Sequence, residues 1–131
     1  MGDEQGCEVS TLKNQGNMRY AIKVNQSGAC PDVPRMALDF IRALQSEGHQ
    51  VIRVFFYHDG VFEGFGASRF EWMELAESGG FDLVLCSQAL EHRGLSLDCQ
   101  IPFIIGGLAL WVDACLKADR VMNFGVASHA V

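Results

Sequence analysis

QVIRVFFY, which spans residues 50–57, is nearly continuous in apolar residues and decides the fold. A strand that is apolar on both sides is typical of the parallel sheets of α/β proteins, because helices bury both of their faces. Shorter apolar runs at 20–24, 81–85 and 121–124 indicate further strands. The sequence therefore predicts four main strands in one sheet.

Helical segments alternate with these strands. Apolar residues at helical spacing, glycine stops and a candidate N-cap predict the following helices: Pro31 to Gly48, Ser68 to Gly80, 87–92 and 105–116. Segment 95–103 stays open between a loop and a partial strand. Strictly alternating strands and helices require right-handed crossovers between parallel strands. We therefore expect a small, doubly wound, mostly parallel α/β sheet.

Composition limits both the size and the class of the protein. The chain has 131 residues, of which 49% are hydrophobic and 20% charged, which fits one globular domain. We assign residues 1–17 to a flexible N-terminal extension and residues 18–131 to the domain. The net charge of −6 argues against direct nucleic-acid binding and against anionic membrane surfaces. The longest apolar stretch, 101–112, is far shorter than a membrane span.

The cysteines favour free thiols over disulfides or a zinc site. Their number is odd, no pair has CxxC spacing, and the four histidines are scattered. Because the acidic start does not read as a secretory signal, we expect a reducing cytoplasm and no bound metal. The five cysteines are Cys7, Cys30, Cys86, Cys99 and Cys115.

Cys86 is the strongest candidate nucleophile. Open parallel sheets bind ligands at the carboxyl ends of their strands, and Cys86 follows the apolar run 81–85 directly. A thiol placed just before a helix lies near the positive end of the helix dipole, which favours the thiolate. The backbone N–H groups of Ser87 and Gln88 can then bind the anionic sulfur. Because cysteine is also a common core residue, a structural role for Cys86 stays open.

Two basic side chains are expected near this thiol. His58 follows the strand 50–57, and Arg93 closes the short helix after Cys86. Both can supply positive charge to a sulfur anion, although a cation at a helix end is favourable in any case. Asp59 with Gly60 is interpreted as a turn. Cys99 is the second candidate thiol.

Several motifs together resemble one protein family. They are MRYAIKVNQ at 18–26, the helix end Glu47-Gly48-His49, VFFYHDGV at 54–61, FDLVLCSQALEHRG at 81–94 and GGLALWVDACLKADRVMNFG at 106–125. With these motifs the chain resembles the DsrE/TusD family of sulfur-relay proteins over almost everything from Met18 to Gly125. The most specific parts are VFFYHDGV and the unit formed by a strand, a cysteine, a short helix and Arg-Gly.

The resemblance implies a flavodoxin-like fold and a single cysteine, here Cys86, that carries a persulfide. It implies assembly with DsrF/TusC-like and DsrH/TusB-like subunits, a TusA-like sulfur donor and a DsrC/TusE-like acceptor. The sulfur would serve tRNA thiolation or sulfur oxidation, without a metal or an organic cofactor. Two segments, 64–80 and 95–105, are shorter than is usual in the family and flank the cysteine.

We therefore expect a sulfurtransferase that accepts sulfane sulfur on Cys86 and passes it to a partner thiol. The first alternative is a non-catalytic interaction subunit of such an assembly. The second is a redox-sensing thiol protein, which would form a stable disulfide or sulfenic acid and would transfer no sulfur.

Overall fold

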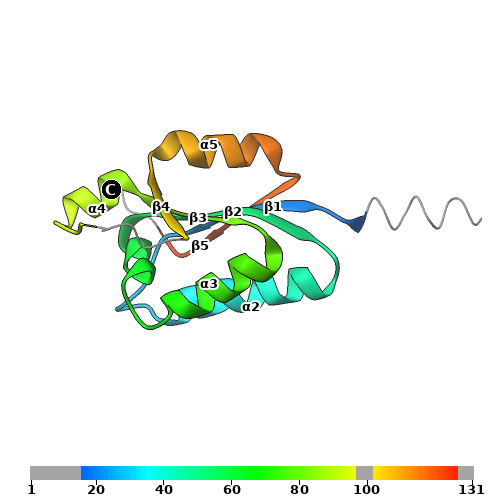
Figure 1. Cartoon of the computed structure of the whole chain (residues 1–131), viewed down its shortest axis with the longest axis horizontal. Helices are drawn as coiled ribbons and strands as arrows, with labels where there is room; N and C mark the ends of the chain where they lie inside the picture. Colours follow the sequence, from blue (N-terminus) through cyan, green and yellow to red (C-terminus); the bar gives the residue numbers. More distant parts are fainter. Residues whose placement is uncertain (1–15, 97–101, 127–131) are drawn as a thin grey trace, which may run out of the picture.

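A five-stranded parallel sheet organises the chain, with helices on both of its faces (Figure 1). The computed structural model describes residues 16–96 and 102–126. The strands are β1 (Arg19–Val24), β2 (Gln50–Phe56), β3 (Asp82–Cys86), β4 (Phe103–Gly106) and β5 (Arg120–Phe124). The helices are α2 (Asp32–Ser46), the 3-10 helix η1 (His58–Gly64), α3 (Arg69–Gly79), α4 (Ser87–His92) and α5 (Leu108–Lys117). The doubly wound α/β expectation is confirmed.

The strand order is β4-β3-β2-β1-β5, and every neighbouring pair is parallel. Helices α2 and α3 cover one face, whereas α5 crosses the other face on its way from β4 back to β5 (Figure 1). The three inner strands carry the residues that fill the core. Fully buried examples are Ile22, Val54, Phe55, Phe56, Val84 and Leu85. This burial on both faces is what the apolar run 50–57 required.

The strand β4 corrects the prediction that a helix begins at Ile105. Phe103 to Gly106 pairs with Leu83 to Cys86 of β3, and the helix begins only at Leu108. Short apolar runs fit a helix or a strand equally well from the sequence alone. Pairing with β3 decides between the two here, so the sheet has five strands where four were predicted.

One of the two end signals that the sequence gives for helix α3 acts as predicted, and the other does not. Gly80 has a φ of 69°, a left-handed conformation that ends the helix and that glycine adopts without strain. Ser68 occupies the N-cap position as expected, but it makes no capping hydrogen bond, and its hydroxyl donates to Glu63 instead. None of the described helices is both long and apolar enough to cross a membrane.

Candidate functional site

The carboxyl ends of the strands meet at one edge of the sheet, as the sequence predicted. Phe56 of β2 pairs in register with Leu85 of β3, and Cys86 pairs with Gly106 of β4. The chain continues after β3 into α4, and after β4 it turns back over the opposite face as α5. Cys86 therefore lies at the carboxyl end of the sheet, where such sheets usually bind ligands.

The Cys86 thiol is buried rather than open at the carboxyl end of the sheet. Cys86 is the last residue of β3 and the N-cap residue of α4, yet its exposed fraction is 0%. Ala89 and Leu90 of α4 belong to the same buried apolar cluster. Alternation along a strand would leave the end residue half open, but Cys86 lies within this buried cluster. A reagent can reach this sulfur only when part of its cover moves.

The first turn of α4 does not form a capping hydrogen bond with the Cys86 sulfur. Among the described residues, Cys86 makes no side-chain capping hydrogen bond to this helix. Ser87 is half-buried, whereas the Gln88 side chain is exposed. The placement of Cys86 directly before a helix is confirmed, but the predicted contact of its sulfur with the backbone N–H groups is not formed in this state.

The segment after β2 packs against the ends of β1 and β3. His58 opens η1 with a φ of 53°, a left-handed conformation that is uncommon outside glycine. Two residues later, a Cβ on Gly60 would clash with the carbonyl oxygen of Val24, so the segment presses onto the end of β1. A Cβ on Gly64 would lie 2.6 Å from a methyl group of Leu85, the residue before Cys86. The turn predicted at Asp59 and Gly60 is thus part of a tight 3-10 helix that packs on the strand ends.

An ion pair ties η1 to α4. The Arg93 guanidinium lies 2.8 Å from the Asp59 carboxylate and also donates to the carbonyl oxygen of Ala89 at 3.1 Å. His58 Nδ1 lies 3.9 Å from the same carboxylate. The structure therefore brings His58 and Arg93 together around Asp59. Sequence reasoning took Asp59 for a turn residue and missed this role.

Glu63 anchors the other end of η1 and was not predicted. The buried carboxylate accepts hydrogen bonds from Trp72 Nε1 at 2.8 Å, from Ser68 Oγ at 2.9 Å and from Ser27 Oγ. These donors come from α3 and from the loops that precede α2 and α3, so Glu63 links three elements. Acidic residues are seldom buried. The only signal in the sequence for the burial of Glu63 is that its neighbours along the chain are apolar or glycine.

The remaining cysteines offer weaker sites. Cys30 is exposed in the loop before α2, and Cys115 on α5 is half-buried rather than in the core. Burial raises the pKa of the Cys115 thiol, which lowers its thiolate fraction, although Lys23 opposes this effect. Cys7 and Cys99 lie outside the described residues. No cluster of three or more potential metal ligands occurs at 16–96 or 102–126.

Comparison with known proteins gives this arrangement a family context. The model of the DsrE/DsrF-like family matches residues 18–124. A putative sulfurtransferase DsrE of Allochromatium vinosum is 30% identical, with 82% of this chain and 99% of the relative covered. Sulfurtransferase TusD of Salmonella arizonae is 31% identical, with 82% of this chain and all of the relative covered. A TusD homologue of Pseudomonas aeruginosa is also 31% identical.

Solved structures share the fold. The ychN protein of Escherichia coli superimposes with a TM-score of 0.69 at 22% identity, over 81% of this chain and 98% of the other. Protein MTH1491 of Methanobacterium thermoautotrophicum gives a TM-score of 0.67 at 16% identity, over 81% and 99%. At these identities the likeness concerns the fold alone. The expected parallel α/β fold is thus supported, while the strand order β4-β3-β2-β1-β5 differs from the order 2-1-3-4-5 of flavodoxin.

Proposed function

Because the chain belongs to the DsrE/DsrF-like family, we propose that it is a sulfurtransferase subunit that carries sulfane sulfur as a persulfide on Cys86. One observation carries the proposal: Cys86 is the last residue of β3, at the sheet edge where ligands bind, and a helix follows it directly. The relatives named sulfurtransferases, at about 30% identity, support transfer of sulfur as the activity.

The transfer consists of two balanced thiol exchange steps. The Cys86 thiolate attacks the outer sulfur of a donor persulfide, a new S–S bond forms, and the donor's own S–S bond breaks. The donor leaves as a thiolate and takes up a proton, while Cys86 carries the terminal sulfur. A partner thiolate then attacks that sulfur and restores the Cys86 thiolate. No net oxidation occurs, and the rate depends on thiolate fraction and access.

Sulfur transfer requires that the donor and the acceptor reach the buried Cys86 sulfur. We propose that α4 and the start of η1 separate from the strand ends when a partner docks, which uncovers the thiol. The Asp59–Arg93 pair holds the two covering elements together, so its release starts the opening. Once the cover is loose, the backbone N–H groups of Ser87 and Gln88 can turn toward the sulfur anion. His58 and Arg93 then supply positive charge beside it.

The exposed apolar surface of α5 supports a role of this chain as one subunit of a larger assembly. Leu108, Val112 and Leu116 of α5 are all exposed and recur at a spacing of four residues, so they form one apolar stripe. We propose that this stripe packs against related DsrF/TusC-like and DsrH/TusB-like subunits. A TusA-like protein would then deliver the sulfur and a DsrC/TusE-like protein would accept it, in tRNA thiolation or in sulfur oxidation.

The test is intact-mass spectrometry of the full chain after incubation with a low-molecular-weight persulfide and removal of the excess. We expect a gain of one sulfur atom that Cys86→Ser abolishes and that Cys115→Ser retains. Cys30→Ser controls for unspecific loading of an exposed thiol. Loaded protein should return to its original mass when an acceptor thiol is added. Loading that persists in Cys86→Ser would refute the assignment.

A second function is favoured by the complete burial of Cys86. A covered thiol without contact to backbone N–H groups suits a structural residue in an interaction subunit that builds the assembly but carries no sulfur. In that case wild-type protein would gain no sulfur at Cys86, whether alone or mixed with its partner subunits. The mass experiment, repeated with the assembled subunits, therefore separates the two functions.

A further inference from the structure

Glu63 is a buried carboxylate without a cationic partner. Its exposed fraction is 5%, and no lysine, arginine or histidine within residues 16–96 and 102–126 forms an ion pair with it. Arg35 lines the surface beside Glu63, but its guanidinium binds Glu71 instead, at 2.7 and 2.8 Å. An ionised group is costly to bury without an opposite charge. A bound cation would offset this cost.

The hydrogen bonds of Glu63 leave acceptor capacity at one of its oxygens. Oε1 accepts from Ser68 Oγ at 2.9 Å and from Trp72 Nε1 at 2.8 Å, whereas Oε2 accepts only from Ser27 Oγ among the described residues. A carboxylate oxygen has two acceptor positions, and a hydroxyl group that donates one hydrogen bond can still accept others. Oε2 and the two serine hydroxyls therefore offer three acceptors, which matches the three N–H donors of a primary ammonium group.

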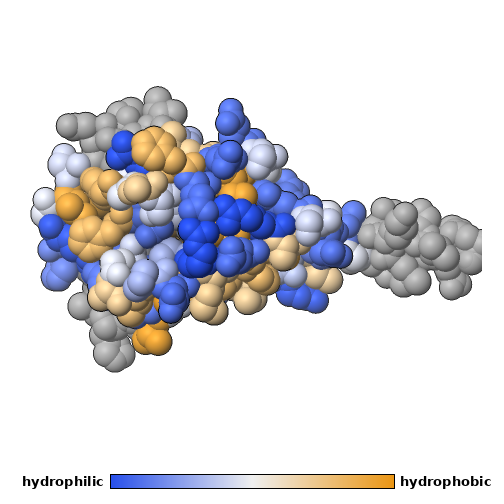
Figure 2. Space-filling view, turned by 90° about the horizontal axis from the view of Figure 1, so that it is seen from below, coloured by the Kyte–Doolittle hydropathy of each residue, from blue (hydrophilic) through white to orange (hydrophobic). Residues whose placement is uncertain are grey.

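Two hollows of the surface meet at this carboxylate. The first has a volume of about 520 Å³ and is lined by Glu63 and by the rings of Phe62 and Phe65. The second, of about 340 Å³, also reaches Glu63 but is lined by Arg35, whose charge repels a cation. In the view from below, hydrophobic side chains gather at the end of the molecule where α3 begins (Figure 2). Because hollows of such volume hold small molecules, the one beside the two phenylalanines suits a small cation with an apolar part.

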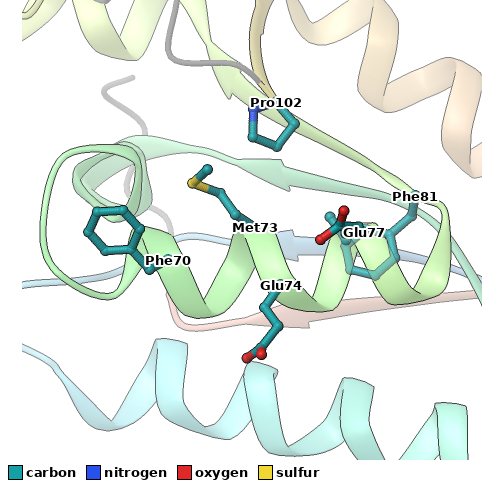
Figure 3. A pocket seen from close by; sticks show the side chains of 7 residues that line it. Phe70, Met73, Glu74, Glu77, Phe81 and Pro102 are labelled. Atoms are coloured by element: carbon teal, nitrogen blue, oxygen red, sulfur yellow. The ribbon is translucent and has the colours of Figure 1, made fainter.

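A larger hollow beside α3 lacks the buried charge. Its volume is about 600 Å³, and Figure 3 shows Glu74 and Glu77 among the side chains that line it. Both residues are exposed, so water solvates their charges and no ligand is needed to offset them. Of these three glutamates, only Glu63 is buried. The larger hollow therefore supplies matched controls.

We propose that the hollow beside Phe62 and Phe65 binds a small molecule that has a primary ammonium group on a compact apolar body. The ammonium group donates hydrogen bonds to Glu63 Oε2 and to the hydroxyls of Ser27 and Ser68, and the apolar body packs against the two rings. Its charge supplies the opposite charge that Glu63 lacks. The inference goes beyond the proposed sulfur transfer and does not depend on it.

The test titrates 2-phenylethylamine into the ¹⁵N-labelled full chain and follows the amide signals of Gly28 and Gly66, which line this hollow, by NMR. We expect saturable shifts with a Kd of about 1 mM. Glu63→Gln keeps the shape of the side chain and removes its charge, so binding should weaken about tenfold. Glu77→Gln removes a charge from the larger hollow and should bind as wild type does.

A second pair of variants leaves the carboxylate untouched, and circular dichroism checks that every variant is folded. Phe62→Ala removes part of the apolar wall and should weaken binding about threefold. Phe70→Ala removes an exposed ring from the larger hollow and should have no effect. If Glu63→Gln does not fold, this pair decides the outcome.

Three further probes test the chemical class of the ligand. 2-Phenylethanol has the same ring without the charge and should bind at least about tenfold more weakly. Calcium should leave the signals unchanged, because Glu63 is the only carboxylate among the described residues that line either hollow at this site. A blocked tripeptide with a central lysine should bind more weakly than the amine.

Several results would overturn the proposal. They are the absence of saturable shifts with 2-phenylethylamine, equal affinity for the alcohol, shifts with calcium, and equal effects of the two variants within either pair. Tighter binding of the lysine tripeptide would also overturn it, since the site would then serve a side chain of a partner protein.

Discussion

Two parts of the molecule pack on the same sheet but are held in very different ways. Helices α2 and α3 span 15 and 11 residues, and Glu71 joins them through Arg35 at 2.7 Å and Arg42 at 2.6 Å. The proposed cover of Cys86 consists of the six-residue α4 and the start of η1, which the Asp59–Arg93 pair connects, whereas Glu63 fixes the other end of η1 to α3. We therefore expect this cover to open while the α2–α3 layer stays folded, as local opening in proteins commonly does.

The largest expected effect concerns the α2–α3 layer. Trp72 is fully buried, its ring lies 4.9 Å from that of Phe56, and it donates to Glu63. Trp72→Ala should lower the free energy of unfolding by about 3–5 kcal/mol, through the cavity and the lost hydrogen bond. Chemical denaturation measures it. Phe70→Ala removes an exposed ring from the same helix and should cost less than about 1 kcal/mol. Equal losses would show that the layer is not the rigid part.

The next effect concerns the cover itself. Asp59→Asn removes the partner of Arg93, whose side chain is 12% exposed. We expect Cys86 to react with a neutral alkylating reagent about fivefold faster, the equivalent of ~1 kcal/mol in the opening equilibrium. Peptide mapping separates Cys86 from Cys30 and Cys115. Because the pair contributes to the native state, the free energy of unfolding should fall by a similar amount.

The fold provides a matched control for that variant. Arg53 is 15% exposed and pairs with Asp82 at 2.9 Å, at the opposite end of β3 from Cys86. Asp82→Asn should lower the free energy of unfolding slightly and leave the alkylation rate of Cys86 unchanged. If both variants accelerate alkylation equally, Cys86 is reached by unfolding of the whole domain and the comparison fails.

The smallest effect is a pH dependence confined to the α2–α3 layer. Hydrogen bonds from Arg35 and then Arg42 lower the pKa of Glu71 from 4.5 to about 2. Since the folded pKa is depressed, this stabilisation is present above pH 4.5 and is lost as the pH falls toward 2. Glu71→Gln should cost about 1 kcal/mol at neutral pH, because the pair is partly exposed. The difference from wild type in unfolding experiments should shrink through that window, and a constant difference would refute it.

The sequence was informative wherever a periodic pattern or a strand end decided the structure. The apolar run 50–57 predicted a strand buried on both faces, and the apolar run 81–85 placed Cys86 at a strand end. The strand at 103–106 was missed because its pairing with β3 is not local. The Asp59–Arg93 pair spans 34 positions, and Glu63 meets its donors only in the folded chain. The burial of Cys86 likewise depends on how α4 and the apolar cluster close over it.

Native-state labelling of Cys86 tests the central claim most directly. Alkylation of this thiol is followed at increasing, non-denaturing concentrations of urea and compared with global unfolding. We predict an opening free energy at least about 2 kcal/mol below that of unfolding, with little dependence on urea, because only α4 and the start of η1 move. An opening free energy and a urea dependence equal to those of global unfolding would contradict it, and would make Cys86 a core residue.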